Sequence, residues 1–195
     1  MTEGPGPFDL ACEGYGSVPA QYMFIGISAG RLGALVSKVP LTRDASGRVF
    51  QRCLRQLELS GSDELCEKPL LRDCYVTNLV KGRCLTENGL NRLPTAVEVL
   101  HWWPFLETEI QKVDPERILL LGRLVYECVG RLAKIEGDIL PRVYPVKHPR
   151  WYCSNGAVNP KSKAFHQMVL DYRDALTYGR NDWKKCIYAN AASTT

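Results

Sequence analysis

Three side chains with the chemistry of a catalytic or binding site follow separate apolar runs of the sequence. Asp44 contributes a carboxylate, Asn78 an amide and His148 an imidazole. A carboxylate and an imidazole can move protons or stabilise charge, and an amide both donates and accepts hydrogen bonds. An acid, an amide and an imidazole that meet at one place indicate an active site more strongly than any one of them alone.

Asp44 follows a glycine-rich turn that closes the first apolar run. Residues 22–27 (YMFIGI) have the length and composition of a buried strand, and the glycines of the turn are Gly26, Gly30 and Gly33. A buried parallel strand that ends in a glycine turn is where open α/β sheets place their ligands. The spacing G-x-x-x-G-x-x-G differs from the G-x-G-x-x-G of dinucleotide-binding folds. We therefore interpret the turn as a wall of a ligand pocket and not as a dinucleotide site.

Four apolar strands alternate with helices along the chain, and this alternation predicts the fold. The strands are expected at about residues 22–27, 74–80, 117–121 and 143–146. The helices are expected to start near residue 46 and to cover about 95–113, 122–132 and 161–176. Such a chain folds as a three-layer α/β/α sandwich with a central, mainly parallel four-stranded sheet. Because the carboxyl ends of parallel strands share one edge, we expect Asp44, Asn78 and His148 to lie together there.

Length and composition indicate one globular domain over residues 1–195, with an irregular arm (1–20) and a frayed tail (189–195). The formal charge of +4 is compatible with a nucleic-acid partner but is a weak indication by itself. No apolar run is long enough to span a membrane, and the first residues lack the layout of a signal peptide. We therefore expect an intracellular protein, cytoplasmic or associated with the nucleoid, without a membrane partner. Its eight cysteines are then expected to be mainly reduced thiols.

Each of the three polar residues also has a purely structural interpretation. Asp44 can cap the helix that follows it, and Asn78 can be a turn residue at a strand end. His148 can be a partly buried histidine with ordinary hydrogen bonds. The other histidines, His101 and His166, fall in helical patterns and are interpreted as structural. Three histidines without ordered Cys/His spacing do not favour a zinc site.

Six short segments, taken in order along the chain, resemble those of the uracil-DNA glycosylase superfamily. They are residues 26–33 (GISAGRLG), 40–47 (PLTRDASG), 75–81 (YVTNLVK), 91–95 (NRLPT), 120–123 (LLGR) and 148–149 (HP). The resemblance spans about residues 20 to 150 and is closest to families 4 and 5, the iron–sulfur glycosylases of thermophilic bacteria and archaea. It implies the α/β/α fold of that superfamily and the excision of a base that has been flipped out of the DNA stack.

The resemblance assigns the water-orienting acid to Asp44. In these families the turn after the first strand lies over the flipped nucleotide, so Gly26, Ile27 and Ser28 are expected to contact the base. Family 4 has its acid directly after the first glycine, where this chain has Ile27. Family 5 is apolar there and places an aspartate in a segment that residues 41–47 match well.

Three further roles follow from the same resemblance. Leu41 falls where the family has an aromatic residue that stacks on the base, so weaker or wider base selection is expected here. Asn78 falls where an amide reads the pyrimidine edge, with a donor and an acceptor that suit O4 and N3–H of uracil. His148 falls where a histidine stabilises negative charge on the departing base.

Basic and aromatic residues near the site are expected to hold the DNA. In the family, the loop after the histidine enters the minor groove as a wedge, a role suited to Arg150 and Trp151. Trp151 has an alternative role in packing on the body of the protein. The expected DNA contacts are Arg31, Arg43, Lys81, Arg92, Arg123, Arg150 and Trp151.

The cysteines depart from the family pattern. Families 4 and 5 hold a 4Fe–4S cluster with four cysteines, two of them in an N-terminal C-x-x-C. This chain has only Cys12 in that region, and Gly82 stands where the third cysteine belongs. The fourth position falls near residues 101–102, and Cys84 is a displaced stand-in at most. We therefore predict no metal and no cluster, with the segment 82–102 held by tryptophan packing instead.

The sequence as a whole predicts a DNA glycosylase of base excision repair that hydrolyses the N-glycosidic bond of uracil or another deaminated base. DNA is the expected partner, and other repair proteins are further candidates. One alternative is a catalytically weak or inactive nucleic-acid-binding protein on the same fold. Another is a protein that cleaves or binds free nucleosides or nucleotides.

Overall fold

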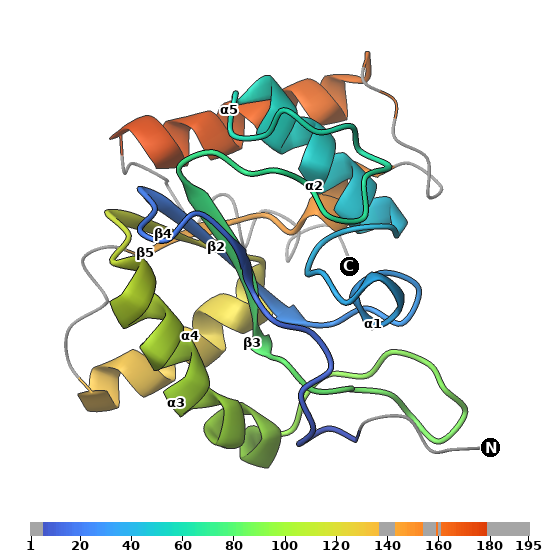
Figure 1. Cartoon of the computed structure of the whole chain (residues 1–195), viewed down its shortest axis with the longest axis vertical. Helices are drawn as coiled ribbons and strands as arrows, with labels where there is room; N and C mark the ends of the chain where they lie inside the picture. The colour runs from blue at the N-terminus through green and yellow to red at the C-terminus, as the bar shows by residue number, and fades with distance from the viewer. Residues whose placement is uncertain (1–5, 137–142, 154–158, 160, 179–195) are drawn as a thin grey trace, which may run out of the picture.

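A central sheet of five strands organises the described part of the chain, which comprises residues 6–136, 143–153, 159 and 161–178 of a computed structural model. The strands are β1 (Tyr15–Gly16), β2 (Tyr22–Ser28), β3 (Cys74–Val80), β4 (Arg117–Leu121) and β5 (Val143–Val146). Their order across the sheet is β1-β3-β2-β4-β5 (Figure 1). All neighbours are parallel except β1, which pairs antiparallel with β3.

The predicted α/β/α sandwich is confirmed, but the predicted count of four strands was wrong. The additional strand is β1, which pairs Tyr15 with Val76 and Gly16 with Tyr75. It lies inside the segment 1–20 that we expected to be irregular. A strand of two residues in a Gly/Pro-rich segment has no periodicity to detect, and only its tertiary partner β3 defines it.

Helices cover both faces of the sheet. Helices α2 (Ala45–Gln56) and α5 (Lys163–Tyr178) lie on one face, and α3 (Ala96–Val113) and α4 (Arg123–Glu136) lie on the other (Figure 1). The short helix α1 (Ala34–Ser37) lies within the loop between β2 and α2, and the short 3-10 helix η2 (Pro149–Tyr152) follows β5. These two short elements lie near strand ends and help to shape the site.

Strand β2 shows how the sequence supplies both layers of the core. Phe24 packs with Phe50 and Tyr172 beneath α2 and α5. Its neighbours Met23 and Ile25 belong to the core on the side of α3 and α4. Successive side chains of a strand point to opposite faces, so one apolar strand buried on both sides serves both cores. The strand is thereby fixed at the centre of the molecule.

Helix α3 begins with a capping box and covers the predicted range. The Thr95 side chain accepts a hydrogen bond from the Glu98 N–H, and the Glu98 carboxylate accepts one from the Thr95 N–H, forming a capping box. The helix ends at Asp114, whose φ of 44° is left-handed. The equivalent N-cap residue of α2 is Asp44, one position before the first residue of that helix.

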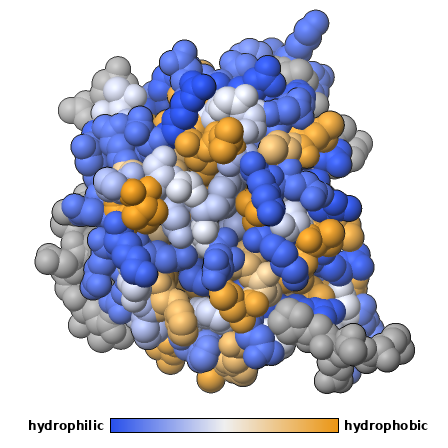
Figure 2. Space-filling view, in the orientation of Figure 1, coloured by the Kyte–Doolittle hydropathy of each residue, from blue (hydrophilic) through white to orange (hydrophobic). Residues whose placement is uncertain are grey.

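The surface is mixed in character. Figure 2 shows hydrophobic residues as separate patches among polar ones on one face of the molecule. Within the described residues, no helix has both the length and the apolar composition needed to cross a membrane.

Candidate active site

A pocket of about 310 Å³ lies where the turn after β2, the end of β3 and the loop after β5 meet. It brings together six residues predicted for the site and one predicted DNA contact, namely Ile27, Ser28, Leu41, Asp44, Asn78, His148 and Arg92. The remaining lining residues are Ala29, Gly30, Ala34, Thr42, Ser46, Asn91 and Leu93. An acid, an amide and an imidazole therefore converge from three separate segments, as the order of strands predicted.

Asp44 has a structural and a pocket-facing role at once. Its Oδ1 accepts a hydrogen bond of 2.8 Å from the Gly47 N–H and so caps α2. Its Oδ2 lies against the glycine turn, because a Cβ added at Gly30 or Gly33 would come within 2.8 or 2.6 Å of it. The two glycines leave the space that this carboxylate occupies. The structural interpretation of Asp44 as a cap and its placement in the pocket are thus both correct.

The environment of Asp44 raises the pKa of its carboxyl group. Burial has the largest effect and disfavours the charged form. The N–H groups of Gly47 and Ser46 donate to the carboxylate and lower its pKa in part. The positive charges of Arg150 and Arg48 also lower it, but burial has the larger effect. The carboxylate is therefore more basic than an exposed aspartate, which suits a group that accepts a proton from water.

The segment around Asp44 is held tightly. Leu41 has a φ of 52°, in the left-handed region, and its carbonyl accepts a hydrogen bond of 3.1 Å from Gln51 Nε2. Thr42 is buried, and its hydroxyl donates to the Val39 carbonyl at 2.9 Å. A Cβ at Gly47 would lie 2.6 Å from the Thr42 backbone, so only glycine fits there. This packing directs the Leu41 side chain into the pocket, where the resemblance implies a stacking residue.

Asn78 is almost fully buried, with 2% of its surface exposed. It lies opposite Gly26 in the register of β3 and β2. A Cβ at Gly26 would lie 2.5 Å from Asn78 Oδ1, so this glycine makes room for the amide. On the other side, Asn78 Nδ2 donates to the Cys12 sulfur at 3.7 Å. Gly26 was predicted to contact the base, but it does not line the pocket and acts by placing Asn78.

His148 presents a neutral ring with a defined tautomer. Its Nδ1 accepts a hydrogen bond of 3.1 Å from the Arg150 N–H, which leaves the ring proton on Nε2. Burial, aided by the positive charge of Arg150, lowers the pKa of His148 to about 4. Gly122, with a φ of 106°, leaves space for the histidine, since a Cβ there would lie 3.2 Å from His148 Cβ. The pocket thus contains an uncharged hydrogen-bond donor.

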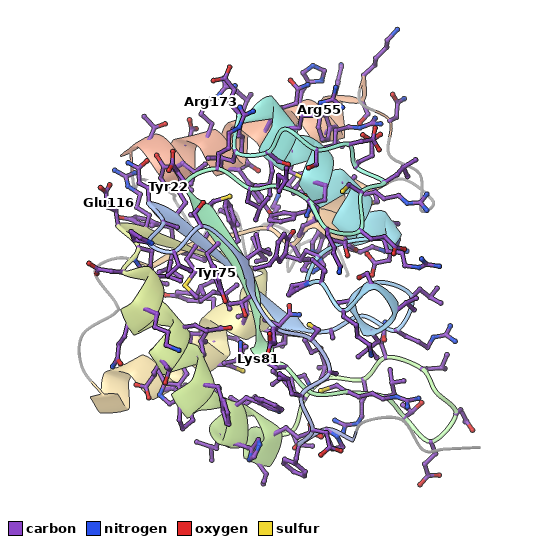
Figure 3. All side chains as sticks on the ribbon, viewed as in Figure 1. Tyr22, Arg55, Tyr75, Lys81, Glu116 and Arg173 are labelled. Atoms are coloured by element: carbon purple, nitrogen blue, oxygen red, sulfur yellow. The ribbon has the colours of Figure 1, made fainter. Side chains whose placement is uncertain are left out.

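Lys81 is buried, which removes it from the expected DNA contacts. Its ammonium donates to Glu109 Oε2 at 2.6 Å, to Thr77 Oγ1 at 2.8 Å and to the Asn78 carbonyl at 2.9 Å. Figure 3 labels Lys81 and Tyr75 on the side of the sheet that faces α3, from which Glu109 comes. A charge with 3% of its surface exposed cannot reach a phosphate. Sequence position alone gave no sign of its partner Glu109, 28 residues away.

The other predicted DNA contacts differ in how free they are. Arg92 is held by Glu98 and by the carbonyls of Leu85 and Leu93, so it braces the pocket wall. Arg43 pairs with Glu67 and Arg123 with Glu127 at the surface. The exposed side chains among the predicted contacts are Arg31, Arg43, Arg123, Arg150 and Trp151.

A second hollow, of about 460 Å³, shares Asp44 with the pocket. Its walls combine basic, acidic and apolar side chains, namely Arg43, Arg48, Glu67, Leu32 and Leu65 beside Ala45, and Arg43 pairs with Glu67 there. The guanidinium of Arg48 donates through Nε to the Arg43 carbonyl at 3.0 Å. The sequence did not single out this hollow, because its residues come from the loop after β2, the first turn of α2 and the segment 60–72.

The residues present do not fit an iron–sulfur cluster. Cys12 and Cys84 are the only cysteines on the segments where the resemblance implies four. At the position of the third, a Cβ on Gly82 would lie 1.9 Å from the Pro7 carbonyl oxygen. That oxygen instead accepts a hydrogen bond of 2.8 Å from Trp102 Nε1. The segment is held by buried tryptophan packing, as expected, and among the described residues no cluster of three metal-ligating side chains occurs.

Some lining residues were not identified from the sequence. Asn91 and Leu93 come from the loop after β3, and Asn91 Oδ1 accepts a hydrogen bond of 2.9 Å from the Arg31 N–H. The segment NRLPT had been singled out, but nothing in it indicated which residues turn inward. Ala29 and Ala34 have no polar side chain that sequence reasoning could have singled out.

Comparison with known proteins shows the family of this chain. A family model described as the uracil DNA glycosylase superfamily matches residues 13–172. The chain belongs to the uracil-DNA glycosylase superfamily. Within this superfamily, a curated relative is the type-4 uracil-DNA glycosylase of Pyrobaculum aerophilum, 29% identical over 138 residues. That match covers 69% of this chain and 62% of the relative, so the chain spans less than two thirds of the relative's length.

A solved structure shares the fold of this superfamily member. It is the crystal structure of wild-type SMUG2 from Pedobacter heparinus, with a TM-score of 0.55 and 15% sequence identity. The match covers 80% of this chain and 74% of that one. At this identity the likeness concerns the fold, and it agrees with the sheet flanked by helices described above.

Proposed function

We propose that this protein is a DNA glycosylase that removes uracil or another deaminated base by hydrolysing its N-glycosidic bond, as the first step of base excision repair. The observation that carries the proposal is the convergence of Asp44, Asn78 and His148 in one pocket. Such an enzyme acts on DNA, so we place it inside the cell.

Asn78 and His148 are proposed to bind the target base and to stabilise it as it departs. The target base leaves the stack and enters the pocket, where the Asn78 amide pairs with its edge. When the bond between C1′ and the base nitrogen breaks, its electron pair stays with the base. The Nε2–H of His148 donates to the base as this negative charge develops, which stabilises the transition state more than the bound substrate. A neutral histidine with its proton on Nε2 can do this without being charged beforehand.

Asp44 is proposed to act on the sugar and on the attacking water. Positive charge grows on the sugar as the base departs, and a nearby carboxylate stabilises it. A water molecule then bonds to C1′ through its oxygen, and its proton passes to the Asp44 carboxylate. The raised pKa of Asp44 favours this transfer. Asp44 then releases this proton to solvent and the departed base takes one up, so the products are an abasic site and the free base.

Base selection is proposed to be broader than in an enzyme with an aromatic stacking residue. Leu41 fills that place with an apolar side chain without a ring face. Stacking of a base on an aromatic ring contributes about 1–3 kcal/mol, so selection here depends more on the hydrogen bonds of Asn78. Uracil, hypoxanthine and xanthine are therefore all candidate substrates.

Arg150 and Trp151 are proposed to contact the DNA beside the flipped nucleotide. Both lie on η2, directly after His148. Trp151 has 66% of its surface exposed, which supports a wedge role over the alternative of packing on the body of the protein. The arginines at the second hollow, Arg43 and Arg48, are suited to a phosphate of the same strand.

A direct assay tests the proposal. Purified protein is incubated with labelled oligonucleotides that each contain one uracil, hypoxanthine, xanthine or mismatched thymine, and alkali then cuts any abasic site. We expect cleavage with at least one base in single- or double-stranded DNA, and its loss in Asp44→Asn. Salt-dependent binding without an abasic product on any substrate would contradict the proposal and favour a binding protein.

A further inference from the structure

The base-reading amide is in contact with a cysteine that the proposed reaction does not use. Asn78 Nδ2 donates to the Cys12 sulfur at 3.7 Å. Cys12 is 3% exposed and packs with Ala29 and Ala34, both of which line the pocket. The thiol therefore lies directly behind residues that line the pocket.

The arm that carries Cys12 is fastened to the strand that carries Asn78. The N–H groups of Ala11 and Cys12 both donate to the Lys81 carbonyl, at 3.0 and 3.3 Å. The Lys81 ammonium in turn donates to the Asn78 carbonyl at 2.9 Å. Lys81 thus holds the backbone of Asn78. It also anchors Cys12, which contacts the Asn78 side chain.

Residues 6 and 7 of the arm are anchored independently. The Pro7 carbonyl accepts a hydrogen bond from Trp102 Nε1, and the Arg83 N–H donates to the Gly6 carbonyl at 3.2 Å. Figure 1 shows this arm beside the loop that follows β3. The arm therefore occupies the region where the resemblance implies a cluster, and through Cys12 it contacts Asn78, which lines the pocket.

The hydrogen bond to sulfur determines what the amide can offer a base. A primary amide has two N–H donors and one carbonyl acceptor. When one N–H is directed at Cys12, one N–H and the carbonyl remain, and this pair complements the O4 acceptor and the N3–H donor of uracil. Burial raises the pKa of the Cys12 thiol to about 11, so the sulfur stays uncharged and can accept this bond without a charge of its own.

We propose that Cys12 is a positioning residue that holds the Asn78 amide in its base-reading orientation, so that the N-terminal arm takes part in base selection. The proposal rests on the glycosylase function proposed above. It gives this cysteine a hydrogen-bonding role in the pocket wall, and Asn78 remains the residue that contacts the base.

Three variants test the role of Cys12 in catalysis. Cys12→Ala removes the hydrogen-bond acceptor, Cys12→Ser restores one, and Cys53→Ala removes an equally buried thiol from the core beneath α2 and α5. We expect kcat/KM on the preferred base to fall about threefold to tenfold in Cys12→Ala, the range typical of one lost hydrogen bond. Cys12→Ser should recover most of this loss, and Cys53→Ala should leave the value unchanged. Equal values for Cys12→Ala and the unaltered protein would overturn the proposal.

A spectroscopic measurement tests the contact without relying on activity. The side-chain amide signals of Asn78 are assigned in a ¹⁵N–¹H spectrum by their absence in Asn78→Asp. They should move in Cys12→Ala, stay close to their original positions in Cys12→Ser, and be unaffected by Cys53→Ala. Unmoved signals in Cys12→Ala would overturn the positioning role. If no base is excised but the signals move as expected, the proposed function fails while the contact stands.

Discussion

At the scale of single residues, Asp44 contributes both to the stability of the fold and to the proposed reaction. Its Oδ1 caps α2 and its carboxylate also lines the pocket. Asparagine caps a helix about as well as aspartate but cannot accept a proton from water. We expect Asp44→Asn to keep the melting temperature within a few degrees and to lower the excision rate by about 10²-fold or more, the usual contribution of a general base. The abasic-site assay and thermal unfolding measure the two effects.

The contrasting variant Asp44→Ala separates the two roles of this residue. It loses the cap as well as the carboxylate, which costs about 1 kcal/mol of stability. A lower melting temperature in Asp44→Ala than in Asp44→Asn, with similar inactivity, is therefore expected. An active Asp44→Asn would contradict the proposed role of the carboxylate.

The pH dependence of the reaction is predicted from His148 and Asp44. Burial lowers the pKa of His148 to about 4, so the ring is neutral throughout the physiological range. Asp44 must be ionised, and its raised pKa moves that requirement to higher pH than for an exposed aspartate. We expect kcat/KM to fall on the acid side only and to be flat around pH 7. A step near pH 6.5, the ordinary value for histidine, would contradict the neutral-donor role of His148.

The same histidine links pH to folding stability. Its pKa is lower in the folded protein than in the unfolded chain, so protons bind the unfolded state more tightly. At pH values above the ordinary pKa of histidine, His148 therefore does not lower the free energy of unfolding. It falls as pH drops from that value towards about 4.

Residues at strand ends were predictable, whereas their partners were not. Asn78 and His148 could be placed because the carboxyl ends of parallel strands share one edge. The burial of Lys81 depends on Glu109, and the bracing of Arg92 depends on Glu98. The sequence does not show whether a basic side chain near a site belongs to a buried ion pair or is exposed and free to bind DNA.

At the scale of elements, the turn after β2 requires glycine at position 33. A Cβ on Gly33 would lie 2.6 Å from Asp44 Oδ2 and 2.8 Å from the Thr42 carbonyl oxygen. We expect Gly33→Ala to displace the carboxylate, to lower activity at least tenfold and to destabilise the fold by about 1–3 kcal/mol. Gly130→Ala in α4 is the matched control, because nothing lies within 4 Å of a Cβ there. That control should be neutral or slightly stabilising.

The link between β3 and α3 is predicted to be structural and not to contact DNA. Lys81→Met leaves Glu109 without its buried partner, which costs about 3–5 kcal/mol in comparable cases. We expect a lower melting temperature but an unchanged dependence of DNA affinity on salt. Arg150→Ala should leave the melting temperature unchanged. It should reduce the slope of log K for DNA binding against log salt concentration by about one. A reduced slope in Lys81→Met would contradict the interior position of that lysine.

Elements with strong local signals were predicted well. The apolar runs of β2, β3 and β4 and the range of α3 follow from patterns of neighbouring residues in the sequence. Strand β1 was missed because its two residues owe their conformation to pairing with Tyr75 and Val76. Helix α2 begins at Ala45, one residue before the predicted start, and its N-cap is Asp44, as the structural interpretation of that residue allowed.

At the scale of the whole molecule, residues 6–12 pack into the region where the resemblance implies an iron–sulfur cluster. Its Pro7 carbonyl fills the space beside Gly82, where the resemblance implies a cysteine. We predict that the purified protein is colourless, contains no stoichiometric iron and melts at the same temperature with or without a chelator. Visible absorbance and iron analysis measure this directly. A brown preparation with a broad visible band would contradict the prediction.

The overlap of cap and carboxylate at position 44 has a consequence for how this chain can change through time. Most substitutions there would weaken the start of α2 as well as the proposed reaction. Selection for a folded protein alone would then remove them, even in a cell that no longer needs the enzyme. A descendant that had lost activity would be expected to carry asparagine or serine at this position. Decay of the function would thus leave a recognisable trace in a single residue.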